Sequence, residues 1–257
     1  MTIRSATLLA AIVLVVSGAP REAEGQTREP SSTISSDRPG LGDGAYMLAP
    51  GVWQAELGLG MDGGGGGRAY SIGQGVLRFG LSGFEVRLYP NSYVLLRDDG
   101  SSESGFQDVG VGFKVPLSAG EGGIRSSVVA GVTLPTGSDL LTADEATGFS
   151  TLVLEGALWD QVGLAVNLGY TFPFEDAADG AIAVIVTPGF PISGVEGLSG
   201  YVGYAGFVYP EEWAADHIVE AGLAYLANAD TQLDVNGGWN PDSDTWFFGA
   251  GVAIRRR

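Results

Sequence analysis

Hydrophobic and polar residues alternate along most of this chain, and the clearest stretch is LRFGLSGFEVRL at residues 77–88. Arg78, Glu85 and Arg87 each lie between apolar neighbours, and only Ser82-Gly83 interrupts the pattern. A period of two places alternate side chains on opposite faces of a strand, and a short break containing glycine is typical of a tight turn. We therefore predict a β-hairpin with one apolar face and one charged face.

The same alternation recurs from residue 53 to residue 255. Strong examples and weaker candidates together predict about twelve strands, each of roughly the length that a tilted strand needs to cross a membrane. With 42 glycines among 257 residues, long helices are disfavoured, because each helical glycine costs about 1 kcal/mol. The predicted fold class is therefore all-β. Besides 77–88, the strong segments are 53–60, 108–115, 125–134, 162–172, 232–239 and 245–255, and the weaker ones are 149–158, 181–192, 198–209 and 217–227.

The connections between these segments favour a membrane barrel over a soluble sandwich. Alternate connections are mostly short, and those between them tend to be longer and acidic, as in outer-membrane barrels with short periplasmic turns and longer extracellular loops. Lys114 is the only lysine, whereas soluble β-proteins commonly protect their edges with lysine. We predict a single transmembrane antiparallel β-barrel and keep the soluble sandwich as the alternative. The short connections are 82–83, 118–123, 160–161, 193–197 and 228–230; the longer ones are 91–105, 136–148, 173–180 and 210–216; two further connections on that side, 62–68 and 240–244, are shorter.

The N-terminal residues predict export. A basic start, an apolar run too short to span a bilayer and the small residues around Ala23-Glu24-Gly25 together predict a signal peptide over residues 1–25. Residues 26–50 would then form a periplasmic or lumen-plugging segment, and residues 51–257 the barrel. The chain has no cysteine, so disulfides cannot hold this exported protein together.

Seven segments follow one another along the chain: SSDRPG (35–40), APGVWQAELGLG (49–60), residues 77–88, FQDVGVGFKVPL (106–117), TLPTG (133–137), TQLDVNGGW (231–239) and TWFFGAGVAIR (245–255). Together they resemble a bacterial outer-membrane transporter family described as the putative phenol-degradation meta-pathway type. The resemblance implies an outer-membrane barrel that takes up small, often aromatic or hydrophobic, solutes. It also implies contact with outer-membrane lipid, lipopolysaccharide and the barrel-assembly machinery. Members usually end on an aromatic residue that the barrel-assembly machinery recognises. Arg255-Arg256-Arg257 stands at that place here, so we expect the assembly signal further inward, at residues 246–248.

Ten charged residues fall on the parity opposite the apolar side chains and are the candidate lumen or constriction residues. Twelve strands at ~4.8 Å spacing and ~40° tilt give a backbone diameter of roughly 24 Å, which leaves about 10 Å or less after side chains are added. Two interpretations stay open: a paired network that braces the wall, and a constriction that selects solutes. The candidates are Glu56, Arg78, Glu85, Arg87, Asp108, Lys114, Arg125, Glu155, Glu220 and Asp234.

Other chemistry finds little support in the sequence. The only histidine, His217, has no marked serine partner, no cysteine or histidine cluster has metal-ligand spacing, and the glycine motifs lie within strands. A net charge of −17 argues against nucleic-acid binding. We expect no enzyme activity, no cofactor and no metal. A channel or transporter for small solutes is the leading prediction; a structural or adhesive barrel with partner-binding acidic loops is the alternative, and a membrane-embedded hydrolase is a distant third.

Overall fold

The computed structural model describes residues 32–98, 100–120, 123–174, 180–210 and 214–257, so the predicted signal peptide and residues 26–31 lie outside the described residues. The described chain is all-β, and no helix within it is long and apolar enough to cross a membrane. Its strands are β1 Trp53–Gly64, β2 Gly67–Gly80, β3 Glu85–Tyr89, β4 Tyr93–Asp98, β5 Ser101–Phe106, β6 Val109–Ala119, β7 Ile124–Leu134, β8 Thr147–Trp159, β9 Val162–Pro173, β10 Ala181–Pro191, β11 Leu198–Tyr209, β12 Ala214–Asn228, β13 Thr231–Asn240 and β14 Thr245–Arg256.

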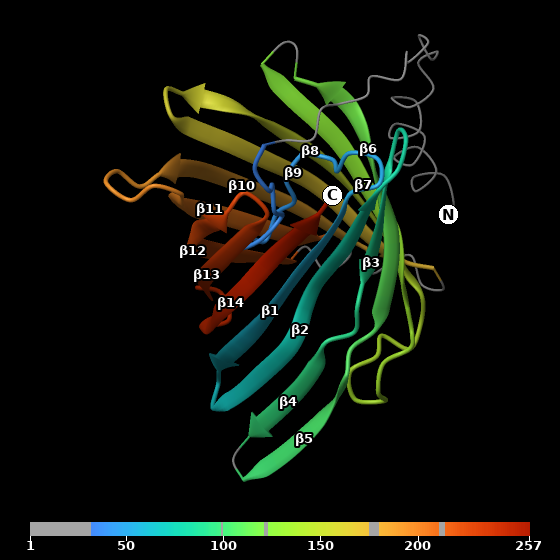
Figure 1. The fold of residues 1–257 in the computed structure, drawn as a ribbon. Helices are drawn as coiled ribbons and strands as arrows, with labels where there is room; N and C mark the ends of the chain where they lie inside the picture. The colour runs from blue at the N-terminus through green and yellow to red at the C-terminus, as the bar shows by residue number, and fades with distance from the viewer. Residues whose placement is uncertain (1–31, 99, 121–122, 175–179, 211–213) are drawn as a thin grey trace.

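One antiparallel sheet closes on itself into a barrel (Figure 1), because β1 pairs with both β2 and β14. Strand β2 pairs with β3 near one end and with β4 near the other; β3 then pairs with β6, while β4 pairs with β5. Of the fourteen strands, β4 and β5 therefore form an extra hairpin that continues the wall, and twelve strands close the barrel. The prediction of about twelve antiparallel strands is confirmed.

The extra hairpin corrects one predicted connection. Residues 91–105 were expected to form a long acidic loop, yet most of them are strand. Strand β5 reads SSESGF and has no apolar alternation, so its conformation is set by pairing with β4 rather than by its own pattern. The expected 62–68 loop is likewise strand on both sides of a turn at Gly65-Gly66.

The two ends of the barrel differ in their connections. We call the end that joins β2 to β3, β6 to β7, β8 to β9, β10 to β11 and β12 to β13 the turn end, and the opposite end the loop end. The longest connection at the loop end runs from β7, which ends at Leu134, to β8, which begins at Thr147. By the usual asymmetry of outer-membrane barrels, we expect the turn end to face the periplasm.

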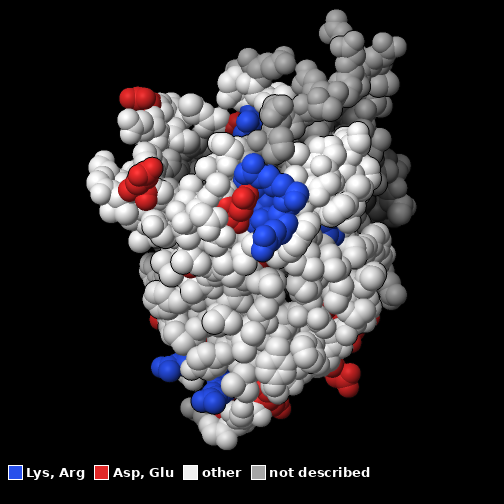
Figure 2. Space-filling model, viewed as in Figure 1, with Lys and Arg blue, Asp and Glu red and all other residues white. Residues whose placement is uncertain are grey.

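Apolar side chains cover the outside of the wall. Phe79 and Val86 are 44% and 41% exposed, whereas their neighbours Arg78 and Glu85 are 1% and 0% exposed. Figure 2 shows that Lys, Arg, Asp and Glu side chains gather toward the ends of the strands on this face, with a largely uncharged surface between them. This distribution inverts that of a soluble protein and matches a wall that faces lipid. The two-faced pattern predicted for residues 77–88 is thus what the structure shows.

The three C-terminal arginines lie at the turn end. Arg255 points inward, is 2% exposed and forms an ion pair of 2.7 Å with Asp230 in the β12–β13 turn, while Arg257 lies 3.2 Å from the same carboxylate. The hydrogen bond from Arg255 is the main reason that the pKa of Asp230 is lowered. Arg256 is exposed and pairs across β1 and β14 with Trp53, on the outward parity that the sequence predicts.

Residues 32–52, which we call the N-terminal segment, run inside the barrel rather than beneath it (Figure 1). Ala45 packs against Val129 and Val153 of the inner wall, and a second buried cluster joins Leu48, Ala49 and Val52 near the start of β1. The core of the protein is therefore the filled lumen, built from the segment and the inward-facing side chains.

Candidate functional site

Asp37 of the N-terminal segment is the centre of a buried ion-pair cluster. Its Oδ2 lies 2.8 Å from Nη1 of Arg87 and 3.3 Å from Nη1 of Arg78, and its Oδ1 lies 3.2 Å from Nζ of Lys114. The three cations come from β3, β2 and β6, and each side chain is 1% exposed or less. Three converging cations require nearby negative charge, because an unpaired buried charge is strongly destabilising.

Two wall carboxylates share these cations. Glu56 Oε1 accepts from Nη1 of Arg78 at 2.8 Å, and Glu85 Oε1 accepts from Nε of Arg78 at 2.8 Å. Strand register explains the meeting, since Arg78 pairs with Arg87 across β2 and β3, and Glu85 pairs with Lys114 across β3 and β6. We call Asp37, Glu56, Arg78, Glu85, Arg87 and Lys114 together the charge cluster.

The opposite wall holds the N-terminal segment through further polar contacts. Arg38 pairs with Asp234 of β13 at 3.0 Å, and the Leu41 amide donates to Glu220 of β12 at 2.9 Å. Because the segment contacts β13 and β12 on one side and the charge cluster on the other, it crosses the lumen.

The segment then follows the wall back to the charge cluster. The Asp43 amide donates to Oδ1 of Asn167 in β9 at 2.8 Å, and the Ala45 amide donates to Oε2 of Glu155 in β8 at 2.9 Å. Asp43 Oδ1 also lies 2.8 Å from Nη2 of Arg87 on β3. Residues 37–45 are therefore tied to both sides of the barrel at once.

Glycines let the segment lie close to the wall. A Cβ at Gly42 would stand 2.9 Å from Nδ2 of Asn167, and a Cβ at Gly44 would stand 3.3 Å from Oδ1 of Asp37. Both distances are tighter than ordinary contacts, so a side chain at Gly42 would displace Asn167 or the segment, and one at Gly44 would crowd Asp37 within the segment itself.

The structure brings nine of the ten predicted residues to the N-terminal segment or its cluster, and one of the nine is Arg125, which stacks on the Tyr46 ring of the segment. Five belong to the charge cluster, and Glu155, Glu220 and Asp234 bind the segment from the other walls. Sequence reasoning missed Asp37, Arg38, Asp43 and Asn167, although the first two stand within the SSDRPG stretch that supports the family resemblance. Their partners lie up to 196 residues away along the chain, so no local signal pointed to them.

Asp108 lies apart from the charge cluster, at the loop end. Its carboxylate accepts from the backbone amides of Thr136, Gly137 and Ala143 at 2.7–2.9 Å. Burial raises the pKa of Asp108, but hydrogen bonds from these amides and from the Thr142 hydroxyl outweigh it, so the pKa is lowered. This side chain holds a loop and is not part of the ion-pair cluster.

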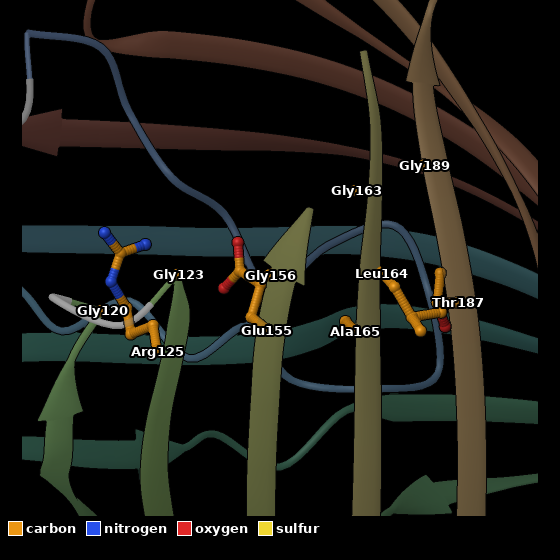
Figure 3. Close-up of a pocket in the computed structure, with 10 residues that line it drawn as sticks. All are labelled: Gly120, Gly123, Arg125, Glu155, Gly156, Gly163, Leu164, Ala165, Thr187 and Gly189. Atoms are coloured by element: carbon orange, nitrogen blue, oxygen red, sulfur yellow. The ribbon is translucent and has the colours of Figure 1, made fainter. Parts of the chain in front are cut away.

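Arg125 stands beside a cavity of about 310 Å³ at the turn end (Figure 3). Figure 3 shows Arg125 of β7 and Thr187 of β10 at opposite sides of this space and Glu155 of β8 between them, with glycine backbone forming much of the wall. The Arg125 guanidinium stacks over the Tyr46 ring at 5.7 Å from its centroid.

A second cavity, of about 540 Å³, lies at the loop end. Its lining includes Gln74 and Tyr89 of the barrel wall, Asp108, and Thr142 of the loop that Asp108 holds. The lumen thus has a cavity toward each end, and the charge cluster with the N-terminal segment lies between them.

Sequence comparison assigns the family. The family described as "Putative MetA-pathway of phenol degradation" matches residues 36–255, which is most of the chain. The chain belongs to this family. A sequence search finds no similar protein among those with curated descriptions.

Solved structures share the fold at low sequence identity. The COG4313 outer-membrane channel from Pseudomonas putida F1 has a TM-score of 0.64 at 11% identity, covering 85% of this chain and 99% of that one. The NanC porin has a TM-score of 0.55 at 8% identity, and the KdgM porin in complex with disordered oligogalacturonate has 0.50 at 11%; each match covers 78% of this chain and 98% of the other. The chain therefore shares the antiparallel β-barrel fold of these channels and porins.

Proposed function

We propose that the protein is a channel for small solutes, and that the N-terminal segment with the charge cluster forms its constriction. The observation that carries the proposal is the arrangement along the lumen, in which one cavity lies toward each end and the N-terminal segment with the charge cluster lies between them. Eight-stranded barrels fill their interior with strand side chains alone, whereas a twelve-stranded barrel has additional space. Here part of that space is filled by a segment held through polar contacts.

The nature of the contacts supports a constriction. A purely structural filling needs only well-packed apolar residues, and replacing buried ion pairs by such residues is often neutral or stabilising. Asp37, Arg87 and Lys114 instead place concentrated charge across the lumen. Charges at such a narrow point set the field that a passing solute meets and thereby tune selectivity.

The family description names phenol degradation, which supports small aromatic or hydrophobic compounds as the solutes. A cavity of about 310 Å³ is at the lower end of the range for small-molecule sites, which is about 300–1,000 Å³. Large oligosaccharides would not fit such a space without displacement of the segment.

The hydrolase alternative has little structural support. His217 Nδ1 contacts the Tyr204 hydroxyl at 2.7 Å, and its ring stacks on that of Tyr204. Among the described contacts of His217, none involves a serine hydroxyl, which a serine hydrolase needs beside its histidine.

Solute flux into liposomes tests the proposal. Full-length protein should admit benzamide, a small neutral aromatic solute, and should exclude a trisaccharide. The matched variant Asp37→Asn should admit benzamide faster, because the segment loses its central anchor. Failure of the wild-type barrel to pass any small solute would favour the structural or adhesive alternative, in which the acidic loops bind a partner.

A further inference from the structure

The cavity at the turn end contains a cation that the charge cluster does not use. Arg38, Arg78, Arg87, Lys114 and Arg255 each form an ion pair with a carboxylate. Arg125 is the only described lumen-facing cation without a carboxylate oxygen within 4.0 Å, and its Nε is buried without a hydrogen-bond partner. Buried polar groups normally have partners, so this one calls for an explanation.

A second unpartnered donor lies across the same cavity. Thr187 lines the cavity from β10, and its hydroxyl is also buried without a hydrogen-bond partner among the described residues. Arg125 comes from β7, and strands β8 and β9 lie between it and β10, so the two groups flank the space (Figure 3). A guanidinium with unused N–H donors and a free hydroxyl are groups that a carboxylate can accept from.

Glu155 stands between them and does not neutralise Arg125. The two residues are register partners across β7 and β8, yet their charged atoms are more than 4.0 Å apart. Glu155 instead turns Oε2 to the Ala45 amide, while the Tyr46 ring holds the Arg125 guanidinium at 5.7 Å. Two adjacent residues of the N-terminal segment therefore keep these opposite charges apart.

The rest of the lining suits a flat body. Five glycines contribute backbone alone and Ala165 a single methyl group, so Leu164 is the only large apolar side chain among the described lining residues. A flat ring packs against exposed peptide planes more fully than a branched chain does. The volume of about 310 Å³ accommodates one such small molecule.

We propose that this cavity is a binding subsite for a small, flat organic carboxylate, whose anionic group is held by Arg125 and Thr187. The inference rests on the proposed channel function, because it places the subsite on the solute path at the turn end. It adds a charge preference that the channel proposal alone does not contain.

Titration of the full-length protein in detergent with benzoate and its neutral isostere benzamide tests the subsite directly. Benzoate should bind more tightly than benzamide, and Arg125→Gln should weaken benzoate binding by about tenfold or more, since a charge-assisted hydrogen bond is lost. Benzamide binding should stay within about twofold of wild type, because it never used the charge. Arg125→Lys should restore part of the benzoate affinity.

Two further variants should change the benzoate affinity in opposite directions. Thr187→Val preserves the shape of the side chain and should weaken benzoate binding by about threefold to tenfold. Glu155→Gln removes a neighbouring negative charge but keeps an oxygen that can accept from Ala45, so it should strengthen benzoate binding. Arg97→Gln, at the loop end beside Tyr70, serves as the charge-matched control and should change nothing.

Equal affinities for benzoate and benzamide, or benzoate binding that Arg125→Gln leaves unchanged, would overturn the subsite. Absence of benzoate binding to wild type would overturn it as well. Binding can be measured without flux. If the barrel binds benzoate but passes no solute, the channel proposal fails and the subsite proposal stands. If the barrel passes benzamide but the titrations show none of the expected differences, the subsite proposal fails and the channel proposal stands.

Discussion

Asp37 and Lys114 form a buried ion pair of 3.2 Å across the lumen, although 77 residues separate them in the chain. The pair joins the N-terminal segment to the wall at β6. The same carboxylate also meets Arg87 and Arg78, so one side chain of the segment balances much of the positive charge on three strands. This convergence makes Asp37 the side chain of the segment on which the charge cluster depends most.

Removal of the Asp37 charge should destabilise the barrel interior. Asp37→Asn leaves three buried cations with less compensation, and loss of one partner from a buried ion pair costs about 3–5 kcal/mol. Urea unfolding in detergent, followed by tryptophan fluorescence, measures the free energy of unfolding. Asp139→Asn makes the same chemical change at an exposed loop position and should leave that free energy unchanged. Equal stabilities of the two variants would show that the cluster does not depend on Asp37.

The two faces of β9 should respond oppositely to a new charge. Leu168 is 44% exposed on the lipid side, so Leu168→Arg should cost about 2–4 kcal/mol if it lies near the middle of the bilayer. Ala165→Arg points into the turn-end cavity, opposite Glu155, and should be tolerated better. Folding yields and unfolding midpoints in lipid bilayers compare the two. A similar penalty at both positions would contradict the assigned faces.

The orientation of the barrel follows from its connections and can be checked on intact cells. A peptide tag inserted after Asp139, in the loop between β7 and β8, should be labelled by an impermeant antibody. A tag inserted after Gly194, in the turn between β10 and β11, should be labelled only after permeabilisation. The reverse result would invert the barrel in the membrane.

Acid should loosen the loop that Asp108 holds. The pKa of this carboxyl is lowered from 3.8 in the folded protein, so its contribution to loop stability is present above that value and is lost as the pH falls through the lower, folded pKa. Hydrogen exchange of the Gly137 and Ala143 amides should accelerate, relative to the intrinsic rate, once the pH falls below the folded-state pKa of Asp108. Asp108→Asn should show fast exchange at neutral pH already. Protection of these amides that does not change with acid in wild type would argue against the carboxylate as their anchor.

The sequence predicted the wall well because alternation is a local property. Arg78 and Phe79 are neighbours in the chain, and their opposite exposure follows from strand geometry alone. Strand β5 escaped prediction because its polar residues carry no alternation, and only pairing with β4 makes it a strand.

The lumen could be predicted only in part. Parity placed Glu56, Arg78, Glu85, Arg87 and Lys114 on the inward face, and barrel closure brings them together. The estimate of a free diameter of about 10 Å or less counted strand side chains only. It could not include the N-terminal segment, because contacts such as Arg38 to Asp234 join residues 196 positions apart and exist only once the barrel has closed.

Single-channel conductance in planar bilayers shows whether the N-terminal segment forms the constriction. Wild-type protein should show a small, reproducible conductance step. Asp37→Asn should show a larger step with altered ion selectivity, because the segment is loosened and the field at the constriction changes, while Asp139→Asn should match wild type. Absence of conductance from the folded wild-type barrel, or the same step and reversal potential for wild type and Asp37→Asn, would contradict a channel whose constriction is the N-terminal segment.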